Sequence, residues 1–253
     1  MRAFSNIIAA KMNLLEDPHL NAMARRNFGY GRWDAKYWFI GPEQGMGKHE
    51  KDDIPGSLKR RAECWRTLGS LELSDCRQFH CCIGERNWHR KKPKVNLQTT
   101  WQPLILLLMT YLKRDADQES CRNYQRDRWG RLDGETCVIE LSGLAAPDAL
   151  TAVGTEHFLP ERIRAICDRL REHQPDLVLM YGRKQQPSWN AIAKCYAGRE
   201  FPPEGSYGLV PKAYVLHNGP TRMVSTPHSS RTVWDGTRYI WHDYWKALGL
   251  KLR

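Results

Sequence analysis

The sequence contains no two cysteines separated by two residues, so it has neither the paired ligands of a zinc ribbon nor a redox Cys-x-x-Cys motif. Eight cysteines are present, at positions 64, 76, 81, 82, 121, 137, 167 and 195. This scatter predicts free thiols, as is usual in a cytoplasmic protein. The longest apolar run, PLILLLMTYL at 103–112, is too short to cross a bilayer and predicts a buried helix.

The two common nucleotide-binding motifs are also missing. The loop YWFIGPEQGMGKH at 37–49 ends in Gly47-Lys48, but a P-loop would need glycine where Pro42 stands. His49 also replaces the hydroxyl that binds magnesium in a P-loop. No G-x-G-x-x-G fingerprint opens a helix. These absences exclude the usual phosphate-binding loops as the purpose of this segment.

Negative charge is scarce relative to positive charge. Asp and Glu number 28 against 39 Lys and Arg, which gives a net charge of +11. A basic surface favours a polyanionic partner, and nucleic acid is the first candidate.

The N-terminal stretch MRAFSNIIAAKMNLLEDPHL lacks the apolar core of a secretory signal. We therefore expect a cytoplasmic protein with no membrane partner.

Short apolar runs alternate with helical patterns from residue 36 onward. The predicted buried strands are KYWFIG at 36–41, TCVIELSGL at 136–144, DLVLMYG at 176–182 and RMVST at 222–226. The last follows AYVLH in a hairpin-like pair, and the predicted helices cover 57–69, 101–114, 159–175, 189–198 and 235–250. We predict a single α/β domain over 1–253, a three-layer α/β/α fold with a central, mainly parallel four-stranded sheet. Its core spans 36–250 and follows a helical segment at 1–30.

In sheets of this kind the ligand binds beyond the carboxyl ends of the strands. Glu43 follows the first predicted strand and His228 follows the last. A carboxylate opposite a histidine suits hydrolysis, because one can activate water while the other stabilises the leaving group. Two structural alternatives stay open, with Glu43 as a helix cap and His228 as a structural histidine.

FIGPEQG at the first strand end, with VSTPHSSRT near the C-terminus, resembles the uracil-DNA glycosylase superfamily. Its first motif is a strand, a glycine and a loop whose acid or amide positions water, and its last is a strand followed by a His-Pro-Ser-like loop. The resemblance follows the order of elements over residues 36–245. It implies a monofunctional DNA glycosylase that flips one nucleotide into a pocket.

The resemblance implies a role for each matching residue. Glu43 would hold the attacking water and His228 would stabilise the departing base. Gly41 matches the opening glycine of the first motif, and Pro42 and Gln44 belong to the same substrate-binding loop. The residues implied to contact DNA are Lys48, Arg183, Lys184, Ser229, Ser230 and Arg231. Ser229 stands where the family has proline, which puts the stiffness of that loop in doubt.

Two departures from the uracil enzymes bear on the substrate. Gly45 stands where a tyrosine would block the space beside pyrimidine C5. Glu140, with Ser142 beyond it, stands where an asparagine would read uracil. A carboxylate accepts from an amino group and repels a carbonyl oxygen, so the pocket implies a cytosine-type edge. Alternatively, Glu140 pairs with a buried arginine, or faces solvent if the strand register differs by one residue.

This combination resembles a phage-defence branch of the superfamily, which removes glucosylated 5-hydroxymethylcytosine from viral DNA. It implies a monomer acting on double-stranded DNA without metal or cofactor, with an abasic site as product. The candidate sugar contacts are Gln44, Lys48, His49 and Gln185. The rival functions are a repair glycosylase for uracil or a deaminated base, and a non-catalytic nucleic-acid-binding module.

One further cluster has the residue types of a metal site. It lies in DCRQFHCCIGERNWH and comprises Cys76, His80, Cys81, Cys82 and His89. Its spacing matches no standard metal motif. Whether it binds a metal is left open by the sequence.

Overall fold

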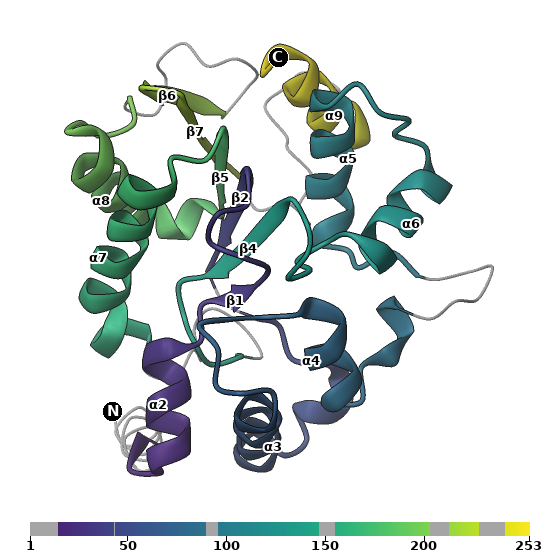
Figure 1. Ribbon diagram of the computed structural model, residues 1–253, viewed down its shortest axis with the longest axis vertical. Coiled ribbons are helices and arrows are strands. Elements are labelled where there is room, and N and C mark those ends of the chain that lie inside the picture. The colour runs from purple at the N-terminus through teal and green to yellow at the C-terminus, as the bar shows by residue number, and fades with distance from the viewer. Residues whose placement is uncertain (1–14, 43, 90–95, 147–154, 203–212, 228–240) are drawn as a thin grey trace.

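The computed structural model describes residues 15–42, 44–89, 96–146, 155–202, 213–227 and 241–253 (Figure 1). Glu43, His228, Ser229, Ser230 and Arg231 lie outside the described residues. Within the described ranges, no helix combines the length and the apolar character that a membrane span requires.

The described strands form one mixed seven-stranded sheet in the order β3-β1-β4-β2-β5-β7-β6. Their bounds are β1 (Gly29–Tyr30), β2 (Tyr37–Gly41), β3 (Leu73–Ser74), β4 (Thr136–Glu140), β5 (Leu177–Tyr181), β6 (Tyr214–Asn218) and β7 (Thr221–Thr226). The neighbours β4, β2, β5 and β7 run parallel, whereas β1 is antiparallel to β4 and β6 to β7. The predicted α/β class is confirmed. The predicted count of four strands is wrong, because two-residue strands carry no readable pattern and the hairpin strand β6 extends the sheet.

The central strands are buried on both faces, which explains their unbroken apolar runs. Successive residues of a strand point to opposite faces. Trp38 and Ile40 of β2 therefore pack into one core with α7 (Thr155–His173) and α8 (Gln186–Ala197), and Phe39 packs into the other. That second core includes α5 (Trp101–Tyr111) and α9 (Trp241–Lys251), so helices cover both faces of the sheet (Figure 1).

The remaining helices are α2 (Pro18–Arg26), α3 (Ile54–Thr67), α4 (Cys76–Cys82) and α6 (Gln118–Asp127). An aspartate caps the start of each, because its side chain accepts a hydrogen bond from the first turn. Short 3₁₀ helices are η1 (Lys48–Glu50), η2 (Arg86–Trp88) and η3 (Arg183–Gln185). Helix α6 lies in the polar segment 113–135, and it buries Cys121, Tyr124 and Gln125.

Two of the cysteines are not free thiols. Cys64 of α3 and Cys82 of α4 form a disulfide, with their Cα atoms 5.8 Å apart. The prediction of free thiols is therefore wrong for this pair, because helix packing rather than sequence spacing brings the residues together. The other six cysteines are free.

Arg162 of α7 binds the main chain around the end of β4. Its guanidinium is 1% exposed, and it donates to the carbonyl oxygens of Leu141 at 2.6 Å and Glu140 at 2.8 Å. It also donates to Ala24 O at 3.0 Å and Asn27 O at 2.8 Å, at the end of α2. The Arg162 side chain thus holds the carboxyl end of β4 against the carboxyl end of α2.

We predict that Arg162→Leu lowers the free energy of unfolding by about 3–5 kcal/mol, because it leaves several buried carbonyls without a donor. Arg164→Leu is the matched control on the same helix, and its exposed side chain should change stability by less than about 0.5 kcal/mol. Urea unfolding of both variants measures the difference. Equal stabilities would contradict this role for Arg162.

Candidate functional site

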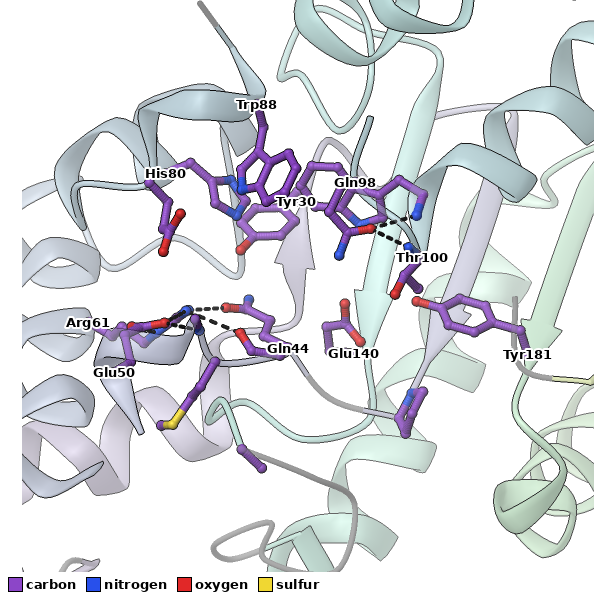
Figure 2. Close-up of a pocket in the computed structure, with 17 residues that line it drawn as sticks. Tyr30, Gln44, Glu50, Arg61, His80, Trp88, Gln98, Thr100, Glu140 and Tyr181 are labelled. Atoms are coloured by element: carbon purple, nitrogen blue, oxygen red, sulfur yellow. Dashed lines mark hydrogen bonds and ion pairs between the residues drawn. The ribbon is translucent and has the colours of Figure 1, made fainter. Parts of the chain in front are cut away.

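The carboxyl ends of the four parallel strands meet at one edge of the sheet. Gly41 at the end of β2 pairs with Glu140 at the end of β4, and Tyr181 of β5 pairs with Thr226 of β7. A pocket of about 340 Å³ opens at this edge, a size that holds a whole small ligand. It is lined by Tyr30, Pro42, Gln44, Gly45, Met46, Gly47, Glu50, Arg61, His80, Glu85, Trp88, Gln98, Thr100, Trp101, Glu140, Ala146 and Tyr181 (Figure 2).

The Glu140 carboxylate lies in the middle of the labelled pocket residues (Figure 2). The side chain is only 4% exposed, so the alternative of a solvent-facing Glu140 is wrong. A Cβ atom on Gly41 would lie 2.2 Å from Tyr181 Oη and 2.9 Å from Glu140 Oε2. Glycine at position 41 therefore allows both side chains to approach the end of β2.

A buried ion pair shapes the loop after β2. Arg61 of α3 donates through Nε to Glu50 Oε1 at 2.8 Å and through Nη2 to Glu50 Oε2 at 2.9 Å. Burial opposes ionisation of Glu50, but the hydrogen bonds and charge of Arg61 hold its pKa below the ordinary value. Glu50 Oε2 also accepts from Gly47 N at 2.8 Å. The pair therefore fixes both ends of the segment 44–50.

The same arginine orients a pocket amide. Arg61 Nη1 donates to Gln44 Oε1 at 2.9 Å. A guanidinium has only donors, so it must take the amide oxygen, and the Gln44 NH₂ group points elsewhere. Gln44 is thereby set to offer a donor in a pocket whose central group, Glu140, is an acceptor when ionised.

The rings of Tyr30, His80 and Trp88 form the wall of the pocket across from Gln44 and Glu140 (Figure 2). The ring centroid of Tyr30 lies 5.2 Å from that of His80 and 6.5 Å from that of Trp101. Burial raises the pKa of the Tyr30 hydroxyl well above its ordinary value, so Tyr30 stays a neutral phenol. Trp88, from η2, completes this wall. The pocket thus combines aromatic rings with many polar and ionisable side chains.

The structure brings four of the predicted substrate-binding residues together, since Pro42, Gln44, Gly45 and Glu140 all line the pocket. Gly41 lies beside Glu140 and Tyr181 at the end of β2. Ser142 does not line the pocket, because its hydroxyl donates to Leu144 O at 2.9 Å within a turn.

The predicted DNA-contacting residues are described only in part. Lys48 lies in η1 and Arg183 in η3, and Lys184 is exposed. Two of the suggested sugar contacts, His49 and Gln185, are not among the pocket-lining residues. His49 instead places Nε2 3.5 Å from Glu85 Oε1.

Sequence reasoning missed the residues that reach the pocket from outside the strand ends. Arg61 and Glu50 stand in charged stretches, and Trp88 and Trp101 stand in segments that indicate only a loop and a helix. His80 also lines the pocket, and with Cys76 and His89 behind it could hold a metal ion. Only tertiary packing places these side chains around Glu140.

Comparisons with protein-family models, with curated proteins and with solved structures give no match for this chain. The resemblance to the uracil-DNA glycosylase superfamily therefore stays a prediction.

We predict that one added methyl group has unequal effects on stability at two glycines of this loop. Gly41→Ala should lower the free energy of unfolding by about 1–3 kcal/mol, because its Cβ would collide with the buried Tyr181. Gly45→Ala should change it by less than about 0.5 kcal/mol, because no atom lies within 4 Å of an added Cβ. Urea unfolding tests both, and a loss of stability in Gly45→Ala would show that the fold requires this glycine.

Proposed function

We propose that this protein is a monofunctional DNA glycosylase that removes a cytosine-type base carrying a bulky group at C5. The substrate that suits the pocket best is glucosylated 5-hydroxymethylcytosine in viral DNA, which makes the protein an anti-phage enzyme. The observation that carries the proposal is the buried carboxylate of Glu140 at the end of β4, inside a pocket large enough for a small ligand.

Glu140 supports the choice of base. An ionised carboxylate accepts hydrogen bonds and pairs with the exocyclic amino group of cytosine, but it repels the O4 oxygen of uracil. The Gln44 amide, oriented by Arg61, adds a donor for an acceptor on the base or its substituent. The pair of groups therefore favours a base edge that presents both an amino group and an acceptor.

The size and lining of the pocket support a substituent at C5. A single pyrimidine ring leaves much of the 340 Å³ unfilled. Gly45 lines this space with no side chain, although its backbone does not demand glycine. Trp88, Trp101, Gln98 and Thr100 also line the pocket. Aromatic and polar side chains together suit a sugar. A site that binds hydroxyls rejects a base that lacks them, so ordinary cytosine would be spared.

The hydrolytic step would use Glu43 and His228, both outside the described residues. The chain neighbours of Glu43, Pro42 and Gln44, line the pocket, and β7 ends at Thr226 on the same edge of the sheet. Glu43 would take a proton from water as it attacks the sugar C1′. The glycosidic electron pair would leave with the base, where His228 would stabilise the charge developing on O2. The product is an abasic site in an unbroken strand.

We predict that Glu140→Gln lowers kcat/KM on glucosylated DNA about 5- to 150-fold, the range of one base-reading pair worth ~1–3 kcal/mol. The amide keeps the shape of the side chain but removes its charge. Glu63→Gln, an exposed position on α3, is the matched control and should retain wild-type activity. Alkali cleaves the strand at each abasic site, and the fragments counted on a gel report the rate. Full activity in Glu140→Gln would rule out its role in reading the base.

We predict that Gly45→Tyr lowers cleavage of glucosylated DNA at least about tenfold, because the ring would occupy the space assigned to the substituent. The free energy of unfolding should stay near that of the wild type, since no atom lies within 4 Å of a Cβ added at Gly45. The same abasic-site assay, with urea unfolding alongside, separates the two effects. A stable Gly45→Tyr protein that cleaves at the wild-type rate would place the substituent elsewhere.

Two outcomes would favour the rival functions. Cleavage of uracil-containing DNA alone indicates a repair glycosylase. DNA binding without cleavage, unchanged by Glu43→Gln and His228→Ala, indicates a non-catalytic module.

A further inference from the structure

Three side chains with metal-binding atoms meet behind the aromatic wall of the pocket. Cys76 and His80 belong to α4, and His89 follows η2. Their exposed fractions are 0%, 8% and 3%. One ligand atom from each lies within 4.8 Å of those of the other two.

The fold explains why the sequence spacing looks irregular. Cys76 and His80 are four residues apart on a helix, so they share one face. The chain then turns at Gly84, which has a φ of 90° that favours glycine, and returns through η2. This turn brings His89 back to α4, with its Nε2 3.9 Å from Cys76 Sγ.

We propose that Cys76, His80 and His89 bind one divalent transition-metal ion, and that zinc suits them best. A thiolate with two imidazoles is a ligand set that zinc prefers. Around a tetrahedral zinc ion, a bound sulfur and a bound nitrogen lie about 3.5 Å apart, given bonds of ~2.3 and ~2.0–2.1 Å. The observed separation of Cys76 Sγ and His89 Nε2 is close to this value.

The surroundings of His80 suit a ligand role. His80 Nδ1 lies 2.7 Å from Cys76 O and 3.5 Å from Cys76 Sγ. A main-chain contact of this kind orients ligating histidines.

One buried polar atom of the cluster, His89 Nδ1, makes no hydrogen bond to any described residue. On metal binding the bond between the Cys76 sulfur and the metal forms and the thiol proton passes to solvent.

The ion would act as a structural link. It would join α4 to the chain end of η2, and so hold Trp88 and His80 in the pocket wall. Three protein ligands leave one position for water. This proposal stands without the glycosylase proposal, because no step of the hydrolysis passes through the ion.

The test is metal analysis of the full-length protein purified without chelators. Elemental mass spectrometry should find about one zinc ion per chain. X-ray absorption at the zinc edge should show one sulfur and two imidazole nitrogens around the ion. Cobalt exchanged into the site should give the near-ultraviolet charge-transfer band of a thiolate ligand.

Variants locate the ion. Cys76→Ser and His89→Gln should each lose the metal and the cobalt band, with folding checked by circular dichroism. Cys121→Ser, a buried free cysteine on α6, is the matched control and should retain both. The proposal is overturned if the wild-type protein neither contains zinc nor binds added zinc or cobalt. It is equally overturned if absorption shows no sulfur ligand, a measurement that needs no variant to fold.

Discussion

The Arg61 guanidinium holds the loop after β2 in the shape on which the pocket depends. It binds both carboxylate oxygens of Glu50, the side-chain oxygen of Gln44 and the main-chain oxygen of Gly45. Burying two charges carries a desolvation penalty, which such complete hydrogen bonding offsets. Removing one partner would leave an uncompensated charge beneath the pocket. The position of Gln44 relative to Glu140 is therefore a consequence of a residue on α3.

The charge of the pocket differs from the charge of the whole chain. The described lining contains three carboxylates, Glu50, Glu85 and Glu140, and one guanidinium, Arg61. The chain as a whole carries +11. In the proposed function, the phosphates would stay at the surface of the basic protein and a neutral base would enter the pocket, which is the separation that base flipping requires.

The sequence predicted the parts of the fold that have an unbroken pattern. Strands β2, β4 and β5 are confirmed because residues buried on both faces form nearly continuous apolar runs. Strand β7 is also confirmed, although its run includes Arg222 and Ser225. The two-residue strands β1 and β3 were not predicted because they are too short to show a period. Helix α6 was not predicted because its charged residues outnumber the few that it buries.

The candidate site was predictable only where it follows the strands. Pro42, Gln44, Gly45 and Glu140 come directly after or at the end of β2 and β4, so the topology of the sheet places them at one edge. Arg61, Trp88 and Trp101 reach the same pocket from separate helical elements, and no spacing in the chain indicates that. For the same reason the sequence did not indicate the Cys64–Cys82 disulfide, and it left open which residues of the cysteine and histidine cluster lie together.

The most direct measurement is an abasic-site assay of the wild-type protein on three otherwise identical duplexes. One is unmodified, one contains uracil, and one contains glucosylated 5-hydroxymethylcytosine. A pocket that reads a cytosine edge through Glu140 and holds a sugar beside Gly45 predicts abasic sites in the glucosylated duplex only. Cleavage of the uracil duplex alone would contradict the role of Glu140, and no cleavage of any duplex would contradict the glycosylase function itself.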